Sequence, residues 1–483
     1  MNQEATPTVS EFEPVIGLEI HVQLKTRTKL FCGNENEFGA EPNEHVCPVC
    51  LGLPGALPVL NRQAVELGVR AALGLHCTVH GHSVFARKNY FYPDLPKGYQ
   101  ISQFDEPFAT DGHLDVPAED EEPTRIRIRR IHLEEDAGKS LHDRLPRATA
   151  VDLNRAGVPL IEIVTEPDVR SPAEARAFLV RLRQALEYLD VSDCNMEEGS
   201  LRVDANVSIR RPGDPLGTKT EVKNMNSFSN VERALVFELA RQRERMSAGD
   251  AIVHETLLWD ASRNEARPMR SKEESHDYRY FPDPDLPSVE IAEPWLESIR
   301  SGIPEMPWAR TARFRETFSL SDEHASQLTA TREIADYYEE VVAAGSEPAD
   351  AASWVMGEVL AAVNQHRSTL SEFAIRPRPL AELLGLLRAG AISRPIARQV
   401  FTTMLTSGRS PSAIVEEEGL GQVNDSAALE GWVDQTVAAH PDEVGRFRGG
   451  ESKLMGFLVG QVMKASAGKA NPKEVVELLR KKL

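Results

Sequence analysis

Two residues with the chemistry of metal ligands, Glu19 and His21, stand in an otherwise apolar stretch near the start of the chain, VIGLEIHVQL at 15–24. The even-numbered positions of this stretch are all apolar, which predicts a β-strand with one buried face. The other face then carries the carboxylate and the imidazole two residues apart. Oxygen ligands with an occasional imidazole suit divalent cations such as Mg²⁺ and Mn²⁺, so we expect this face to line a cavity.

Three further stretches bring ligand-type side chains into strand-like patterns. In SLRVDANVSIR, alternation places Arg202, Asp204 and Asn206 on one face. In RIRIRRIHLEEDAGKS, at 125–140, isoleucine alternates with arginine before the stretch reaches its histidine and three acids. In NRAGVPLIEIVTEPD, Glu162 is a single acid inside an apolar run, where a carboxylate is costly unless it is paired, hydrogen-bonded or bound to a cation.

These acids and the basic residues near them fit phosphoryl transfer, in which a metal is held between carboxylates and phosphate oxygens. For any single strand a solvated outer face is the simpler interpretation, but the recurrence of such faces favours one shared cavity. AGKS at 137–140 does not complete a Walker A loop, because Leu133 stands where that loop needs its first glycine. If ATP binds, it binds without a P-loop.

The cysteines offer a second candidate metal site. Cys47 and Cys50 form a CPVC motif, and Cys32 precedes them. Structural zinc sites usually have four protein ligands, and Asn34 stands where a C-x-C pair would supply the fourth. The cysteines therefore leave two alternatives open, a zinc knuckle and a loop without metal.

The chain that must position these residues is long and of ordinary composition. Its 483 residues are 41% hydrophobic and 27% charged, which allows several domains and excludes wholesale disorder. The N-terminus has neither the basic start nor the apolar core of a signal peptide, and no run reaches membrane-spanning length. Five cysteines in so long a chain argue against a disulfide framework. We expect a cytosolic protein with no membrane attachment.

The pattern of the chain changes after about position 293. Strand-like alternation recurs before it, between helical segments such as 172–188, whereas the residues after it form successive amphipathic helices. We predict an α+β fold with a large mixed sheet-and-helix catalytic body, an all-α helical domain, and a linker followed by a small α-helical tail domain. The expected bounds are 1–294, 295–405 and 406–483.

The tail differs in charge from the rest of the chain. The formal net charge is −19, which by itself opposes nucleic-acid binding, but basic residues outnumber acidic ones between 444 and 483. A glycine pair, Gly449 and Gly450, lies within this segment. A solvated helical end explains such a charge run as simply as a surface that contacts polyanion locally.

The sequence lacks the signature of an amide-hydrolysing nucleophile. It contains no G-x-S-x-G elbow, and Cys194 in VSDCNMEEG lacks the flanking glycines of one. If the reaction uses ammonia from glutamine, another chain must release it.

Long motifs along the chain resemble the B subunit of the tRNA-dependent amidotransferases, and the resemblance runs essentially from end to end. The matching motifs include VIGLEIHVQLKTRTKLFC, CPVCLGLPGALPVLN, RKNYFYPDLPKGYQISQ, HLEEDAGKS, DLNRAGVPLIEIVTEPD, MEEGSLRVDANVS, TEVKNMNSF, DYRYFPDPDLP and GFLVGQVMKASAGKANP.

The resemblance implies an activity, partners and cofactors. The enzyme converts Glu mischarged on tRNA(Gln), and often Asp mischarged on tRNA(Asn), into Gln or Asn for translation. The B subunit phosphorylates the side-chain carboxylate with ATP and Mg²⁺, and ammonia then attacks the acyl phosphate. The A subunit, a glutaminase, supplies that ammonia, and a small C subunit completes a heterotrimer.

The resemblance also suggests roles for individual residues. The candidates for divalent-metal ligation or its immediate surroundings are Glu19, His21, Glu135 and Glu162, with Glu134 in reserve. The candidates for binding the phosphates of ATP are Arg87, Lys88, Lys139, Arg155 and Arg202. Two further polar residues are expected to line the same catalytic pocket, Asp204 and Asn206. Three lysines of the tail are expected to bind tRNA, Lys453, Lys464 and Lys469. Family members without a zinc knuckle exist, so zinc at Cys32, Cys47 and Cys50 stays open.

Two interpretations from other functional classes compete with this one. A metal-dependent nuclease or phosphohydrolase built on the same acids would cleave a phosphoester without glutamine or ATP. A non-catalytic scaffold that presents tRNA to its partners would tolerate replacement of the acids. The sequence leaves the substrate range open between Glu-tRNA(Gln), Asp-tRNA(Asn) and both.

Overall fold

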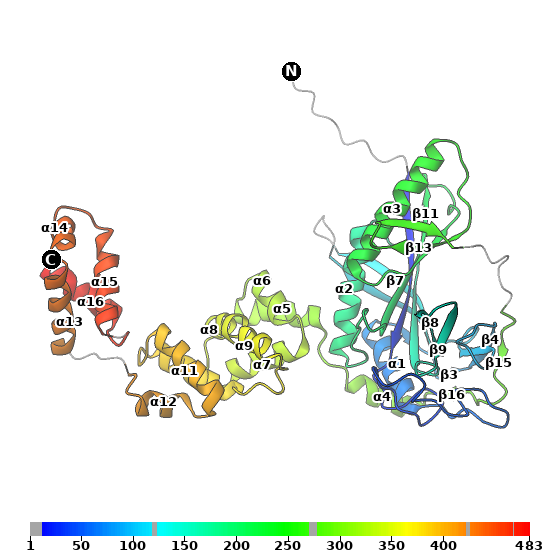
Figure 1. The fold of residues 1–483 in the computed structure, drawn as a ribbon, viewed down its shortest axis with the longest axis horizontal. Helices are drawn as coiled ribbons and strands as arrows, with labels where there is room; N and C mark the ends of the chain where they lie inside the picture. The colour runs from blue at the N-terminus through cyan, green and yellow to red at the C-terminus, as the bar shows by residue number, and fades with distance from the viewer. Residues whose placement is uncertain (1–11, 118–122, 270–277, 422–425, 467) are drawn as a thin grey trace, which may run out of the picture. The chain divides into compact units, whose positions relative to one another are not determined.

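The alternating stretch that contains Glu19 and His21 forms strand β1 (Glu13–Gln23), the middle strand of a nine-stranded sheet. The protein is described by a computed structural model, which covers residues 12–117, 123–269, 278–421, 426–466 and 468–483 (Figure 1). The chain divides into two compact units, Met1–Met306 and Pro307–Leu483.

The large sheet of the first unit is almost entirely antiparallel. Its strand order is β14-β13-β12-β11-β1-β10-β7-β6-β2, with only the β12–β13 pair parallel. The strands of this sheet are β1, β2 (Thr78–Val79), β6 (Ala109–Val116), β7 (Thr124–Glu135), β10 (Pro159–Thr165), β11 (Leu201–Arg210), β12 (Thr220–Lys223), β13 (Thr256–Asp260) and β14 (Glu265–Pro268).

Three smaller sheets accompany the large one. Their order is β15-β4-β5, β16-β3 and β8-β9. Their strands are β3 (His82–Ser83), β4 (Ala86–Asn89), β5 (Tyr99–Ser102), β8 (Lys139–Leu145), β9 (Ala148–Asp152), β15 (Phe281–Pro282) and β16 (Val289–Glu290).

One face of the large sheet is apolar and is covered by helices. Helices α2 (Pro172–Tyr188) and α3 (Phe228–Ser247) lie side by side against it, and α1 (Arg62–Gly74) packs near β7 (Figure 1). Helix α2 begins where the sequence signals a start: Ser171 accepts a hydrogen bond from the Glu174 N–H, and Pro172 occupies the first turn. Because the helices bury the apolar face, the ligand-type side chains are left on the opposite face.

The second unit is helical throughout its described residues. It contains two separate hydrophobic clusters, one from Phe314 to Leu420 and one from Leu429 to Leu479. Its helices are α5 (Pro307–Phe318), α6 (Asp322–Leu328), α7 (Arg332–Ala343), α8 (Pro348–Trp354), a π-helical turn (Val355–Val359), α9 (Leu360–His366), α10 (Pro377–Arg388), α11 (Arg394–Ser407), α12 (Pro411–Glu417), α13 (Ser426–Ala439), α14 (Pro441–Arg448), α15 (Leu454–Ala465) and α16 (Pro472–Lys482). No helix in the described ranges is long and apolar enough to span a bilayer.

The predicted α+β fold is confirmed: a mixed sheet-and-helix body precedes helical C-terminal parts. The structure divides the chain later than the expected position 294/295. That position lies inside α4 (Glu293–Ser301), which packs on α1, with the Arg62 guanidinium 4.7 Å from the centre of the Trp295 ring. The expected third domain begins at position 406, before α12, yet Ile414 of α12 belongs to the first hydrophobic cluster of the second unit.

Candidate active site

The register of the sheet places four polar residues in one row across neighbouring strands. His21 on β1 is opposite Arg202 on β11 and Glu162 on β10, and Glu162 is opposite His132 on β7. Because directly opposed residues of an antiparallel pair project to the same face, the row forms on the face away from the helices.

At the centre of this row, one imidazole and two carboxylates converge. The Nε2 atom of His21 lies 3.4 Å from Oε1 of Glu134 and 3.6 Å from Oε2 of Glu162. One ligand atom from each of these residues lies within 4.8 Å of the other two. The Glu134 side chain is 3% exposed and the Glu162 side chain 13%, so both acids are largely withdrawn from solvent. We call His21, Glu134 and Glu162 the acid–imidazole cluster.

The charges of this cluster compensate one another. Burial favours the neutral form of Glu162, but His132 and His21 outweigh it and hold the pKa of that carboxyl well below its usual range. Burial likewise opposes the charged form of His21, yet hydrogen bonding to Glu162 and the charge of Glu134 raise its pKa. For His132, the same two acids overcome burial and raise the pKa to about 9. The carboxylates therefore favour positive charge between them.

Glu19 lies two residues before His21 on β1 and adds a third carboxylate near the acid–imidazole cluster. It is opposite Val164 and Asp204 in the sheet, and Nδ2 of Asn206 donates to its Oε1 at 3.0 Å. Burial, followed by repulsion from Glu162 and Glu221, raises the pKa of Glu19. The negative charges of Glu162 and Glu221, each of which raises this pKa less than burial does, also attract a cation.

A cavity of about 410 Å³ opens over the cluster, and we call it the polar cavity. Three cationic side chains line it, Lys88, Arg129 and Arg130. Burial alone lowers the pKa of Lys88, but the neighbouring Glu134 outweighs it and raises the pKa. The remaining residues that line the cavity are Glu19, Ser102, Gln103, Phe104, His132, Glu134, Glu162, Val164 and Tyr280.

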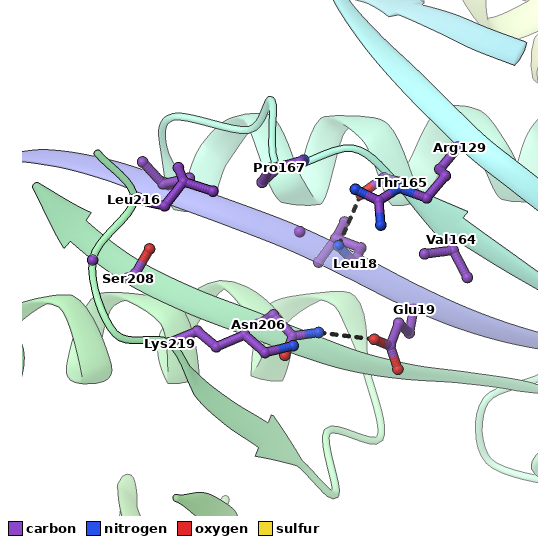
Figure 2. Close-up of a pocket in the computed structure, with 13 residues that line it drawn as sticks. Leu18, Glu19, Arg129, Val164, Thr165, Pro167, Asn206, Ser208, Leu216 and Lys219 are labelled. Carbon is purple, nitrogen blue, oxygen red and sulfur yellow. Dashed lines mark hydrogen bonds between the residues drawn. The ribbon is translucent and has the colours of Figure 1, made fainter. Parts of the chain in front are cut away.

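A second cavity of about 250 Å³, the side cavity, adjoins the polar cavity. The two share Glu19, Arg129 and Val164 as lining residues. Figure 2 shows Glu19 and Asn206 projecting from neighbouring strands into the side cavity, joined by their hydrogen bond, with Leu216 at the other end. The other lining residues are Val15, Gly17, Leu18, Thr165, Pro167, Ser208, Gly217 and Lys219.

The acid–imidazole cluster fits a divalent cation. Two carboxylates and one imidazole are a donor set that Mg²⁺ and Mn²⁺ accept. The low pKa of Glu162 keeps its carboxylate ionised, and the neighbouring acid Glu19 adds negative charge. Binding of the cation requires the neutral form of His21, so the cation competes with the proton whose binding the acids favour.

Of the four residues predicted as metal ligands, Glu19 and Glu135 lie outside this cluster; Glu19 lines the polar cavity next to it, unlike Glu135. The Glu135 side chain forms an ion pair with Lys97 and accepts a hydrogen bond from the Ile101 N–H at 2.9 Å. Glu134 and Glu135 are consecutive residues of β7, so their side chains project to opposite faces. The structure therefore brings Glu134, rather than Glu135, to His21 and Glu162.

The predicted phosphate-binding residues separate into two groups. Lys88 reaches the polar cavity, whereas Arg87 binds Asp283 at 2.8 Å and Asp285 at 2.7 Å. Arg155 donates to the backbone carbonyls of residues 137 and 138.

The other two predicted phosphate-binding residues, Arg202 and Lys139, do not line the polar cavity. Arg202 pairs with the buried Asp136 at 2.9 Å, and the Lys139 side chain is exposed on β8. Of the expected pocket residues, Asp204 pairs with Lys223 at 2.6 Å and Asn206 lines the side cavity.

His132 and Tyr280 are not among the site residues predicted from the sequence, although both line the polar cavity. His132 precedes Glu134 by two residues on the same strand, so period-two alternation carried a signal for it. The Tyr280 ring stacks on Phe104 at a centroid distance of 4.0 Å, and these rings are too far apart in sequence for any local pattern to pair them.

The three cysteines Cys32, Cys47 and Cys50 converge, with ligand atoms within 4.8 Å of one another. Asn34 directs its Nδ2 donor at the Cys50 sulfur, 3.4 Å away, and the ammonium group of the fully buried Lys29 lies 3.9 Å from it. A hydrogen bond from Cys32, together with the charge of Lys29, lowers the pKa of Cys50 to about 5 despite its burial. An amide donor and an ammonium group thus lie where a fourth ligand would bind, so these residues do not fit a closed structural zinc site.

The three predicted tRNA-binding lysines lie around α15. Lys453 precedes the helix and is exposed, Lys464 is exposed in its last turn, and Lys469 is partly buried beyond it. Gly450, between α14 and α15, has a φ of +105°, a conformation that favours glycine.

Models of two protein families match the chain. Residues 14–297 match the GatB/GatE catalytic domain family and residues 336–483 match the GatB domain family. The chain is 52% identical over 477 residues to the B subunit of the aspartyl/glutamyl-tRNA(Asn/Gln) amidotransferase of Carboxydothermus hydrogenoformans, and the match covers 98% of this chain and 99% of the relative.

Proteins of the same name from two other bacteria are similarly close. The protein of Geobacter sulfurreducens is 53% identical, covering 98% of this chain and 99% of the relative. The protein of Oleidesulfovibrio alaskensis is 51% identical, covering 98% of this chain and all of the relative.

Proposed function

The chain belongs to the B-subunit family of the aspartyl/glutamyl-tRNA amidotransferases, which are carbon–nitrogen ligases, and from this premise we propose that it phosphorylates the side-chain carboxylate of a tRNA-bound amino acid. The substrate is Glu on tRNA(Gln), Asp on tRNA(Asn), or both. The observation that carries the proposal is the acid–imidazole cluster, which lies with Lys88 at one cavity beside a second cavity.

The phosphates of ATP belong over the acid–imidazole cluster. His21, Glu134 and Glu162 would hold Mg²⁺, which supplies neutralisation of phosphate charge when bound. Lys88, Arg129 and Arg130 line the same cavity and add positive charge on the side of the incoming groups. This placement lets two anions, a triphosphate and a carboxylate, approach each other.

The nucleoside of ATP belongs in the side cavity. Val15, Leu18 and Leu216 give that cavity apolar walls, and Asn206 and Ser208 supply polar groups. The side cavity meets the polar cavity at Glu19 and Arg129. A nucleotide bound across this junction would point its phosphates toward the acid–imidazole cluster.

The reaction proceeds in two balanced steps. A carboxylate oxygen of the amino acid attacks the terminal phosphorus of ATP, the bond from that phosphorus to the bridging oxygen breaks, and ADP leaves. Ammonia then attacks the carbonyl carbon of the acyl phosphate, inorganic phosphate leaves with the attacking oxygen, and the nitrogen loses a proton. The first step is needed because a free carboxylate offers only oxide as a leaving group. Lys88, opposite the two acids, is positioned to balance charge on the departing phosphate.

The ammonia comes from a partner chain. The sequence has no G-x-S-x-G nucleophile elbow, so a glutaminase A subunit releases ammonia and a C subunit completes a heterotrimer in the cytosol. The tail binds the charged tRNA through Lys453, Lys464 and Lys469. The phosphate contacts that these lysines provide hold the tRNA with little dependence on its sequence.

The test uses the chain purified with its A and C subunits. Glu-tRNA(Gln) and Asp-tRNA(Asn) are supplied separately with ATP, Mg²⁺ and ammonium chloride, so that glutamine hydrolysis is bypassed. We expect ADP and the amidated aminoacyl-tRNA in equal amounts, and we expect His21→Ala to lose both. The control is Arg127→Gln, which removes an ion pair with Asp168 near the start of β7 and should retain both products. Phosphoester cleavage without ATP would support a nuclease, and full amidation by His21→Ala would support a scaffold role.

A further inference from the structure

His132 lies beside the two acids of the acid–imidazole cluster, at the polar cavity. Its Nε2 atom is 3.1 Å from Oε2 of Glu162 and 3.7 Å from Oε2 of Glu134. The side chain is 3% exposed. The imidazole therefore contacts both carboxylates while little of its own surface is open to a substrate.

His132 and His21 face different oxygens of Glu134 and the same oxygen of Glu162. Oε2 of Glu134 also accepts a hydrogen bond from the Ser102 hydroxyl at 3.2 Å, while its Oε1 faces His21 at 3.4 Å. Glu134 thus has one oxygen held by Ser102 and His132 and the other facing His21, whereas Oε2 of Glu162 lies between the two imidazoles. A carboxylate fixed in this way loses less rotational freedom when it binds a metal.

His132 is not a member of the acid–imidazole cluster. The group whose ligand atoms lie mutually within 4.8 Å consists of His21, Glu134 and Glu162, without His132. We propose that His132 is a positioning residue, which donates its Nε2–H to Glu162 and orients both acids for a divalent cation. This inference rests on the proposed metal site and adds a residue to it.

The other ring nitrogen of His132 supports a functional reason for the imidazole. Its Nδ1 atom is buried and has no hydrogen-bond partner among the described residues. An unsatisfied buried polar atom is destabilising. An apolar ring would fill the same place without that cost, but it would leave Glu162 without this partner, so the contact of the imidazole with the acids is what favours a histidine here.

The local sequence accounts for the position. His132 and Glu134 are two residues apart on β7, so one strand supplies both a ligand and the group that orients it. Register then sets His132 opposite Glu162 on β10. Ile131, the residue before His132, is fully buried in the core and offers a control on the same strand.

The experiment measures Mn²⁺ binding by the purified heterotrimer from the electron paramagnetic resonance signal of free Mn²⁺. We expect His132→Phe to weaken binding about 10- to 100-fold. The amide N–H of His132→Gln reaches as far as Nε2. Its Mn²⁺ affinity should therefore stay within about 3-fold of wild type, a much smaller change than that expected for His132→Phe. Ile131→Val should lower the melting temperature without changing Mn²⁺ affinity.

The outcomes separate this inference from the metal site on which it rests. If wild type binds Mn²⁺ and His21→Ala does not, the site stands, and unchanged affinity in His132→Phe overturns the role of His132 alone. If wild type binds no Mn²⁺, the proposed metal site itself fails. If His132→Phe does not assemble, His132→Gln is compared with His132→Asn, whose shorter side chain cannot reach Glu162. Equal Mn²⁺ affinity of these two variants overturns the inference.

Discussion

The Nε2 atom of His21 lies 3.6 Å from a carboxylate oxygen of Glu162, and the two residues are directly opposite each other on the antiparallel strands β1 and β10. They are far apart in sequence, so the pair exists only once the sheet has formed. Backbone pairing of the strands does not depend on either side chain. Substitutions in the acid–imidazole cluster should therefore remove function while leaving the fold.

The neighbouring acids Glu134 and Glu135 should respond differently to replacement by glutamine. Glu134→Gln removes a carboxylate from the acid–imidazole cluster, and we expect Mn²⁺ affinity to fall by at least about 100-fold with little change in melting temperature. Glu135→Gln leaves the buried Lys97 ammonium without its counter-charge, which should cost about 3 kcal/mol of unfolding free energy. Calorimetric titration and denaturant unfolding of the two variants measure both quantities. Equal Mn²⁺ affinity in the two variants would contradict the assignment.

Lys88 and Arg87 make a second matched pair on β4. Lys88→Met should raise the KM for ATP about 10-fold or more, because the polar cavity loses a cation placed to bind phosphate, while stability stays close to wild type. Arg87→Met should instead lower stability, because Asp283 is fully buried and loses its guanidinium partner. Steady-state kinetics with ammonium chloride, together with thermal melting, distinguish the two effects. A wild-type KM in Lys88→Met would place the phosphates elsewhere.

The cysteine cluster should gain zinc when Asn34 is replaced by cysteine. The variant supplies a fourth thiolate beside Cys32, Cys47 and Cys50, and four thiolates match the preferred tetrahedral set. We expect about one zinc per chain in Asn34→Cys and substoichiometric zinc in wild type, measured by inductively coupled plasma mass spectrometry after dialysis. Asn34→Ser is the control, because it removes the amide without adding a ligand. Stoichiometric zinc in dialysed wild type would show that three thiolates suffice here.

Removing the lysines around α15 should weaken tRNA binding. The triple variant Lys453→Gln, Lys464→Gln and Lys469→Gln should lower affinity for charged tRNA and reduce the slope of log affinity against log salt by about 1 per lysine that contacts phosphate. Glutaminase activity of the complex should be unchanged.

The control for these lysines is Arg446→Gln, since Arg446 already pairs with Glu451 at 2.7 Å and contributes little free charge. Filter binding at several salt concentrations supplies the slope for each variant. An unchanged slope in the triple variant would remove the tail from the proposed tRNA interface.

Hydrophobic alternation predicted the parts of the site that depend on one strand. In β1 it placed Glu19 and His21 on the face opposite the buried residues, and the structure has them there. In β7 the alternation of isoleucine with arginine stops before the histidine and the three acids, whereas the observed strand continues to Glu135. The pattern therefore does not choose between Glu134 and Glu135, and resemblance alone favours Glu135.

Contacts between distant segments were beyond reach of the sequence. The partner of Arg87, Asp283, follows it by 196 positions, and nothing near Arg87 signals that its charge is already used. The partner of Glu135, Lys97, lies in a loop whose path depends on the small sheets. Strand register, which sets His132 opposite Glu162, likewise emerges only from the assembled sheet.

The most direct test of phosphoryl transfer follows an oxygen atom. Glu-tRNA(Gln) carrying oxygen-18 in its side-chain carboxylate is converted by the heterotrimer with ATP, Mg²⁺ and ammonium chloride, and the released phosphate is analysed by mass spectrometry. If the carboxylate is phosphorylated, each inorganic phosphate carries one labelled oxygen, and His21→Ala releases none. Labelled AMP with unlabelled pyrophosphate would show adenylation instead, and unlabelled phosphate with amidated product would contradict activation of the carboxylate by the terminal phosphoryl group.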